Sequence, residues 1–204
     1  MTSFTKDDVE VIKKESLHDG YFNTNKYYIK HRKYDGGWTE VFTREVFERG
    51  HAVAVLLYDP TTEEFVLIEQ FRFPAMETAK TPWLIEVVAG IIDEGETHEN
   101  VCHREAQEEA GVVIEKLTKA CEFLMSPGGS TERLYAYVGK VDSTKADGIH
   151  GLDEETEDIK VLRVPELHAR DWLDSGKIDN STAIILLQWF FLNKAKLLNE
   201  WQHY

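Results

Sequence analysis

The segment 86–111 constrains this chain more than any other, because it joins the end of a strand, a polar loop and a helix. It reads EVVAGIIDEGETHENVCHREAQEEAG and holds eight carboxylates against one arginine. Its start continues an apolar run, which predicts a β-strand, and the stretch from about Thr97 to Ala110 predicts a helix that Gly111 ends. Such a segment suits a chain in which helices pack on a sheet.

The predicted helix has two chemically different faces. Glu105, Glu108 and Glu109 project from one face, because residues three or four apart are neighbours on a helix. Like charges at that spacing destabilise an isolated helix by a few tenths of a kcal/mol per pair, about 0.2–0.5. The opposite face carries small apolar residues suited to packing on a sheet, namely Cys102, Ala106, Ala110 and Val113. From the residues alone, the acidic face is either a solvated surface or a site for a hard divalent cation such as Mg²⁺.

The rest of the chain predicts a mixed α/β fold. Residues 8–50 carry short alternating runs that predict a small antiparallel sheet, at Val9–Ile12, Tyr27–His31 and Trp38–Phe42. Six further strands are predicted at Val53–Leu57, Phe65–Phe71, Leu84–Ala89, Cys121–Met125, Leu134–Val141 and Ile159–Val164, with helices from Pro165 to about Ser175 and over Asn180–Asn199. We therefore expect a β-appendage over residues 1–50, followed by a sheet with helices on its faces over residues 51–204.

Composition excludes several classes of partner. The formal net charge of -14 argues against nucleic acid or an anionic membrane, since phosphate backbones need clustered Lys and Arg. No apolar run approaches the roughly 20 residues that span a bilayer, and the polar N-terminus has no signal-peptide pattern. Cys102 and Cys121 have no metal-ligand spacing and are expected to be reduced core residues. We expect a soluble cytoplasmic protein.

One long motif favours the cation site over the solvated surface. Gly90, five residues, Glu96, seven residues and then the run REAQEEAGV over residues 104–112 resemble the Nudix box at every defined position. That motif fixes nine positions over 23 residues, so a chance match is negligible. The resemblance implies an α/β/α sandwich with a mixed sheet, in which metal binds between the helix and the pyrophosphate of the substrate.

The resemblance extends over nearly the whole chain to the ADP-ribose pyrophosphatase branch of the Nudix superfamily. The segments that carry it are REVFERGHAVAVL (44–56), VLIEQFRFP (66–74), PWLIEVVAG (82–90), SPGGSTER (126–133) and HGLDEETEDIKV (150–161). It implies hydrolysis of ADP-ribose to AMP and ribose 5-phosphate. Alternatives are another nucleoside diphosphate sugar such as GDP-mannose, a dinucleotide, or a non-catalytic nucleotide-binding module, against which the complete set of glutamates argues.

The resemblance also assigns roles to particular residues. Two or more Mg²⁺ ions, which Mn²⁺ can replace, would be held by the Ala89 carbonyl, Glu105, Glu109 and Glu157. Glu155 would be the general base, with Glu108 in support and Arg104 orienting the loop and the glutamates. Substrate would contact Tyr21, Arg44, Arg49, Arg72, Ser126, Gly128 and Glu132. Taken alone, the arginines would be surface charges and Tyr21 ordinary sheet packing.

A homodimer is expected as well. A sheet formed by residues 8–50 is too small to bury both of its faces. The resemblance places Arg44, Arg49 and Tyr21 at a site shared between subunits. We therefore expect N-terminal strands to be exchanged across a two-fold axis.

Overall fold

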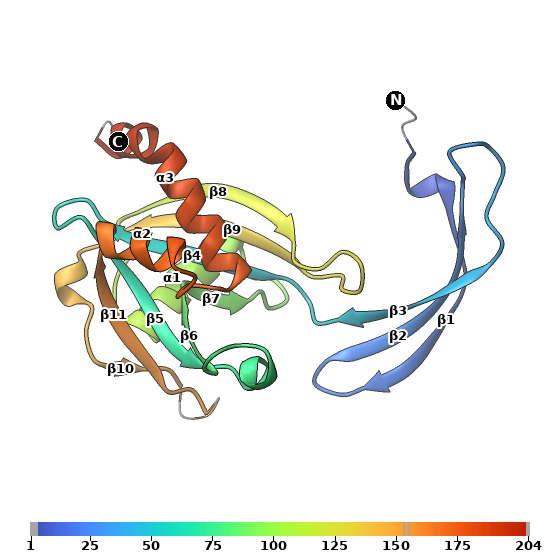
Figure 1. Ribbon diagram of the computed structural model, residues 1–204, viewed down its shortest axis with the longest axis horizontal. Coiled ribbons are helices and arrows are strands. Elements are labelled where there is room, and N and C mark those ends of the chain that lie inside the picture. Colours follow the sequence, from blue (N-terminus) through green and yellow to red (C-terminus); the bar gives the residue numbers. More distant parts are fainter. Residues whose placement is uncertain (1–3, 153, 155, 203–204) are drawn as a thin grey trace. The chain divides into compact units, whose positions relative to one another are not determined.

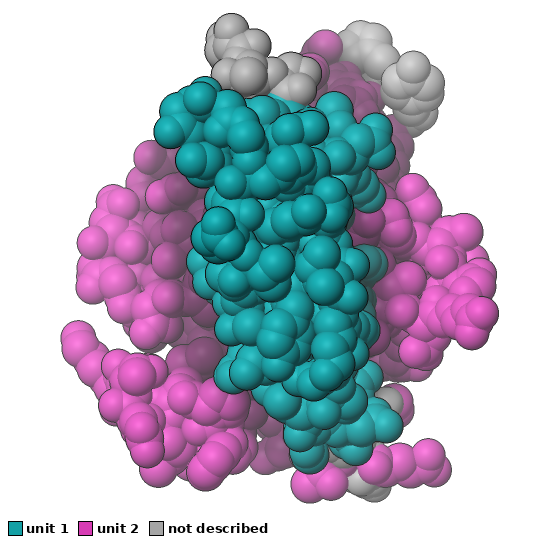
Figure 2. Space-filling view, turned by 90° about the vertical axis from the view of Figure 1, so that its right-hand side faces the viewer, with its two compact units in different colours: residues 1–51, 124–133 teal, residues 52–123, 134–204 magenta. Residues whose placement is uncertain are grey.

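The structure is a computed structural model that describes residues 4–152, 154 and 156–202, and it divides into two compact units. The first unit comprises residues 1–51 and 124–133, and the second comprises residues 52–123 and 134–204 (Figure 2). We refer to them as the N-terminal unit and the core unit. In the described part of the chain, no helix is long and apolar enough to cross a membrane.

The N-terminal unit contains a three-stranded antiparallel sheet, as predicted. After a short 3-10 helix, η1 (Lys6–Asp8), strands β1 (Val9–Asp19), β2 (Asn23–His31) and β3 (Phe42–Glu48) pair in that order (Figure 1). The predicted strand at Trp38–Phe42 is wrong. Trp38 makes only an isolated bridge to Arg32, because Gly36 and Gly37 adopt positive φ angles of 93° and 76° and turn the chain there.

This sheet has almost no core of its own. Asn25 is the only residue that is buried in its three strands as described. Several apolar side chains of the N-terminal unit are exposed instead, including Val9, Val11, Ile12, Leu17 and Val41. The segment 124–133 joins the end of β3, where the Phe47 N–H donates to the Gly129 carbonyl at 2.8 Å.

The core unit is built on a mixed eight-stranded sheet. Six strands follow the order β10-β11-β5-β4-β9-β8, which are Ile149–His150, Ile159–Pro165, Glu64–Phe71, Ala52–Asp59, Arg133–Lys140 and Lys116–Leu124. β4 and β9 run parallel, whereas β5 is antiparallel to both β4 and β11. The six predicted strands are all found, but β8 begins at Lys116, earlier than the predicted Cys121, and β10 was not predicted. One further segment differs.

That segment is Leu84–Ala89, predicted as one strand and found as two. β6 (Trp83–Glu86) pairs with β5, and β7 (Val88–Ile91) pairs with β4. The division has a topological cause. β4 and β5 pair with each other only between Leu57–Asp59 and Glu64–Val66. Beyond these residues the two strands separate, so β4 pairs there with β7 and β5 pairs with β6.

Helices cover both faces of the sheet, which confirms the predicted α/β/α sandwich. All eight residues of β4 are buried, as expected for a strand covered on both faces. Val53, Val55 and Leu57 share a hydrophobic cluster with α1 (His98–Ala110). On the other face, Tyr58 lies 4.5 Å from the ring of Phe190 in α3. Figure 1 shows α3 (Ser181–Gln202) in front of the sheet, beside α2 (Glu166–Asp174).

The capping residues predicted the bounds of α1 correctly, but the burial of one residue after the helix was predicted wrongly. The Thr97 hydroxyl accepts the Asn100 N–H at its start, and Gly111 ends it with a φ of 64°. Cys102, Ala106 and Ala110 are buried against the sheet, as predicted. Val113 is 69% exposed, contrary to prediction, because the left-handed turn at Gly111 redirects the chain away from that face.

Candidate active site

Helix α1 ends in a concentration of negative charge. Glu105, Glu108 and Glu109 occupy its last two turns, and no basic residue stands in its last turn. The C-terminal end of a helix carries partial negative charge, so carboxylates there are unfavourable unless positive charge compensates them. The surroundings of each carboxylate show how much compensation the protein itself supplies.

Glu109 is buried and held by the backbone of β7. Its residue is 3% exposed, and its Oε2 accepts a hydrogen bond of 3.1 Å from the Ala89 N–H. Burial raises the pKa of Glu109 well above its ordinary value, and Glu105 and Glu157 raise it further, although the Ala89 N–H and Arg72 oppose them. The protein alone therefore does not compensate the charge on this carboxylate.

Glu105 lies against the same strand. A Cβ atom at Gly90 would stand 1.8 Å from Oε1 of Glu105, so only glycine lets this carboxylate approach the backbone so closely. Burial raises the pKa of Glu105 to about 7; Arg104 opposes the rise, and Glu108 and Glu157 add to it. Two neighbouring carboxylates with raised pKa values make a site that favours a cation.

Arg104 links the loop before α1 to the helix. Its guanidinium donates to both oxygens of Glu96 at 3.3 Å, to Oε1 of Glu105 at 2.8 Å and to Oε2 of Glu108 at 3.0 Å. Burial alone would lower the pKa of Arg104, but these three carboxylates outweigh it and raise the pKa. Arg104 therefore sets the orientation of two glutamates while the Glu109 carboxylate is held separately.

The segment between β10 and β11 brings a fourth carboxylate to this region. The Gly151 N–H donates to the Glu108 carbonyl at 3.3 Å, which attaches the segment to the end of α1. Glu157 accepts a hydrogen bond of 3.4 Å from Gln70, and its charge acts on both Glu105 and Glu109. The predicted base, Glu155, lies outside the described residues.

Arg72 is paired with Glu86, a carboxylate to which the sequence analysis assigned no role. Its Nε and Nη2 donate to the same oxygen of Glu86 at 3.0 and 2.8 Å. Burial would lower the pKa of Arg72, but Glu86, Glu109 and Glu157 together raise it. The missed signal is the register of β5 with β6, which pairs Ile68 with Glu86 and so brings Glu86 near the end of β5.

Three of the predicted substrate residues gather in the N-terminal unit around Phe22. Tyr21 is 86% exposed and its ring meets that of Phe22 at 4.6 Å in an edge-on geometry. The guanidinium of Arg49 lies 5.1 Å from the Phe22 ring and 3.5 Å from the carboxylate of Glu132. The exposed Tyr21 ring is thus free of sheet packing on most of its surface.

Ser126 and Gly128 belong to the same unit, in a tight turn. The Ser126 carbonyl accepts the N–H groups of Gly129 and Ser130 at 3.0 and 2.8 Å, as expected for a turn. Gly128 has open space around it. Arg44 is not brought to this group. It stands three residues before Phe47 on β3, hence on the other face of the strand, and lies over the Phe42 ring at 4.6 Å.

The predicted ligand set contains only oxygen donors, which suits a hard divalent cation. In the described part of the chain, no three His, Cys, Asp or Glu side chains are grouped closely enough to enclose a metal ion as they stand. Arg104 accounts for part of this, since it draws Glu105 and Glu108 toward itself. Glu105 and Glu109 nevertheless both lie against β7, at Gly90 and at the Ala89 N–H, and their oxygens are of the kind that a hard divalent cation prefers.

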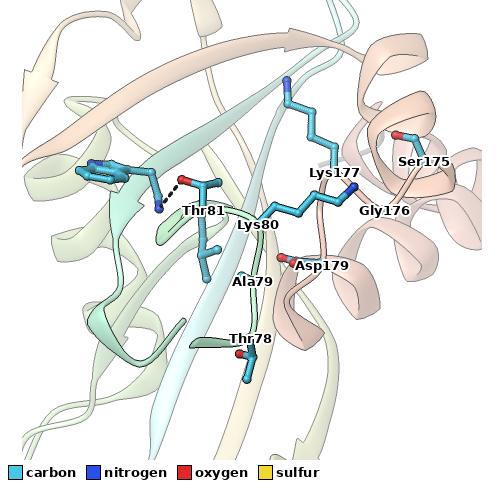
Figure 3. Close-up of a pocket in the computed structure, with 10 residues that line it drawn as sticks. Thr78, Ala79, Lys80, Thr81, Ser175, Gly176, Lys177 and Asp179 are labelled. Carbon is cyan, nitrogen blue, oxygen red and sulfur yellow. Dashed lines mark hydrogen bonds between the residues drawn. The ribbon is translucent and has the colours of Figure 1, made fainter. Parts of the chain in front are cut away.

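A separate pocket of about 510 Å³ lies in the core unit between the loop before β6 and the turn between α2 and α3 (Figure 3). Lys80, Lys177 and Asp179 line it, and the ammonium of Lys177 is 3.5 Å from the ring centroid of Trp172. Among the described residues, none of those predicted for the active site lines this pocket. The acidic cluster therefore remains the candidate active site.

Comparison with known proteins gives a consistent result. A family model for the NUDIX domain matches residues 48–181. An ADP-ribose pyrophosphatase of Escherichia coli (strain K12) is 48% identical over 98% of this chain and 95% of its own length. One of Haemophilus influenzae is 43% identical over 98% of this chain and 93% of its own length, and a GDP-mannose pyrophosphatase of Pectobacterium atrosepticum is 33% identical over 88% and 92%.

A solved structure of an ADP compounds hydrolase shares the fold. Its TM-score is 0.72 at 18% sequence identity, and the match covers 96% of this chain and 98% of that one. The family model, the near full-length relatives and the acidic cluster on α1 agree with one another. This chain therefore belongs to the Nudix family.

Proposed function

We propose that this protein hydrolyses the pyrophosphate bond of ADP-ribose in a Mg²⁺-dependent reaction that yields AMP and ribose 5-phosphate. The observation that carries the proposal is the placement of two α1 carboxylates against β7, with Glu109 held by the Ala89 N–H and Glu105 lying over Gly90. The relatives that are 43–48% identical over nearly the whole chain are ADP-ribose pyrophosphatases, which supports the choice of substrate.

The cations would be held by Glu105, Glu109, Glu157 and the carbonyl of Ala89. Two or more Mg²⁺ ions bound there would neutralise charge on the pyrophosphate oxygens and lower the pKa of water. Mn²⁺ can take the place of Mg²⁺, because carboxylate and carbonyl oxygens suit both. Arg104 keeps Glu105 and Glu108 oriented by the hydrogen bonds that it donates to each.

The protein's own groups then perform the proton transfer and hold the substrate. Glu155 would take the proton of the attacking water. Arg72 would bind a phosphate oxygen, sharing its guanidinium between the substrate and Glu86. Ser126, Gly128 and Glu132 would face the terminal ribose, and Tyr21 would stack on adenine.

A homodimer would supply the remaining contacts. The three-stranded sheet leaves Val11 and Ile12 more than half exposed and buries only Asn25 in its described strands. Two copies that exchange these strands would cover that apolar surface and bring Tyr21, Arg44 and Arg49 to a shared site. We propose the cytoplasm as the location, since Cys102 and Cys121 are both free thiols.

Two other functions compete with this one. A different nucleoside diphosphate sugar or a dinucleotide would use the same acidic cluster, and the GDP-mannose pyrophosphatase at 33% identity gives that alternative weight. A non-catalytic module is less well supported, because the glutamates of the motif are all present.

A substrate panel with product identification tests the proposal. The protein is incubated with Mg²⁺ and ADP-ribose, GDP-mannose or a dinucleotide, and alkaline phosphatase then releases phosphate only from the monophosphate products. We expect ADP-ribose to give the highest kcat/KM, with AMP and ribose 5-phosphate on chromatography. Faster cleavage of GDP-mannose would make GDP-mannose the substrate. No hydrolysis of any tested compound would favour the non-catalytic binding module.

A further inference from the structure

Gln70 is a buried polar residue on the face of the sheet that packs against α1. Along β5 it follows Val66 and Ile68, which belong to the hydrophobic cluster shared with that helix. Its cross-strand partner Ile159 belongs to the same cluster, and Gln70 itself is 6% exposed. Alternation along the strand predicts an apolar residue here, so the amide needs a reason to be present.

Only half of this amide has a partner. Nε2 of Gln70 donates to Oε1 of Glu157 at 3.4 Å. Oε1 of Gln70 is buried and has no hydrogen-bond partner among the residues that the structure describes. An ionised carboxylate only accepts hydrogen bonds, so the amide nitrogen has to face Glu157 and the amide oxygen has to face the other way.

The amide nitrogen of Gln70 contacts a carboxylate of the acidic cluster. Glu157 belongs to the segment that the Gly151 N–H attaches to the end of α1, the helix that carries Glu105 and Glu109. A buried acceptor without a donor is unfavourable, so the Gln70 Oε1 would be stabilised by a hydrogen-bond donor. Mg²⁺ bound by a few carboxylates keeps several of its waters, and such waters are strong hydrogen-bond donors.

We propose that Gln70 is a positioning residue for the divalent cation site. Its amide nitrogen holds the carboxylate of Glu157 toward the site, and its amide oxygen accepts a hydrogen bond from the hydration shell of the cation. The inference rests on the metal site of the proposed function and adds to it a residue outside the Nudix box. Among the described residues, the Glu157 carboxylate also accepts a contact of 3.5 Å from the Leu152 N–H, so Gln70 is one of two described donors that hold it and the only side chain of the two.

Replacement by leucine separates this role from a purely structural one. Gln70→Leu keeps the side-chain volume and removes both the donor and the unpartnered acceptor. The unfolding temperature of the metal-free variant should be equal to or higher than that of the wild type, because a buried unsatisfied group is gone. Cation affinity should fall about 10- to 100-fold, the usual effect of losing a group that orients a metal ligand.

The test measures Mn²⁺ binding without substrate, by electron paramagnetic resonance, for the wild type and four variants. Gln70→Leu and Gln70→Met should both bind Mn²⁺ about tenfold more weakly or worse, with a smaller metal-induced rise in Tm. Glu69→Gln is the matched control, since Glu69 lies next to Gln70 on the opposite face of β5 and should leave affinity unchanged. Glu109→Gln should lose most of the binding.

Each result has one meaning. Mn²⁺ affinity of both Gln70 variants within about twofold of the wild type, or a lower metal-free Tm with affinity unchanged, would overturn the inference. Equal binding by Glu109→Gln would instead overturn the metal site of the proposed function. If ADP-ribose is not cleaved but the Gln70 variants still bind Mn²⁺ weakly, the positioning role stands and the proposed substrate is wrong.

Discussion

The backbone N–H of Ala89 donates a hydrogen bond of 3.1 Å to the Glu109 carboxylate, whose residue is 3% exposed. The contact joins β7 to the last turn of α1. It holds the carboxylate where water cannot solvate it, and Glu105 and Glu157 add repulsion that the single N–H does not offset. The folded protein should therefore be least stable when no cation compensates these carboxylates. The first three predictions follow from this.

Glu109→Gln should lower kcat with ADP-ribose by at least about 10²-fold while the fold is retained, because the residue is assigned as a metal ligand. Steady-state kinetics and circular dichroism provide the measurement. Glu94→Gln is the control, since Glu94 is an exposed carboxylate of the same acidic segment. Near-normal turnover of Glu109→Gln at low Mg²⁺ would remove Glu109 from the ligand set.

The metal-free protein should lose stability as pH rises between about 4.5 and 7. The folded protein holds the Glu105 proton up to a pKa of about 7, whereas the unfolded chain releases it near the model value of 4.5. The folded state therefore binds more protons in that window, and its advantage is lost as pH rises through the folded pKa. We expect roughly 1–2 kcal/mol from this group after solvent screening.

Urea unfolding in EDTA at pH 5 and pH 8 measures that loss. Glu105→Gln should reduce the difference between the two pH values, and added Mg²⁺ should restore stability of the wild type at pH 8. An unchanged pH dependence in Glu105→Gln would show that burial of Glu105 is not its cause.

Substrate binding should require a divalent cation. The segment 86–111 carries eight carboxylates, so without metal it should repel a pyrophosphate. Calorimetry with a non-hydrolysable methylene analogue of ADP-ribose should show affinity at least about tenfold weaker in EDTA than with Mg²⁺. Equal affinity in the two conditions would contradict this prediction.

Glu155→Gln should lower kcat by about two to four orders of magnitude and leave Mn²⁺ affinity nearly unchanged, as expected for a general base. Glu157→Gln should weaken both, because Glu157 is assigned as a ligand. Kinetics and Mn²⁺ binding on the same preparations separate the two roles. If Glu155→Gln kept its kcat and Glu108→Gln lost it without a change in metal binding, the base would lie on α1.

The protein should be a homodimer with active sites shared between subunits. Arg44→Ala and Glu109→Gln, each nearly inactive alone, should recover about a quarter of wild-type activity when unfolded together and refolded, since half of the dimers then carry one intact site. Sedimentation gives the oligomeric state. A monomer that keeps full activity at assay concentration would refute the shared site.

Much of this site could be predicted from the sequence, because its signals are local. Thr97 and Gly111 bound α1 through a cap and a left-handed turn, which depend on a few neighbouring residues. The spacing of Glu105 and Glu109 places them on one helical face wherever the helix lies. The continuous apolar run of β4 indicates cover on both sides, and both are covered.

Other features depended on segments that meet only in the folded chain. Glu108 and Glu109 are adjacent in sequence and equally acidic, yet only Glu109 is buried, because its side chain reaches the Ala89 N–H of β7. Arg72 pairs with Glu86 through the register of β5 and β6. Propensity and periodicity act over a few residues, whereas desolvation depends on which distant strands pack against a side chain, and only the tertiary structure decides that.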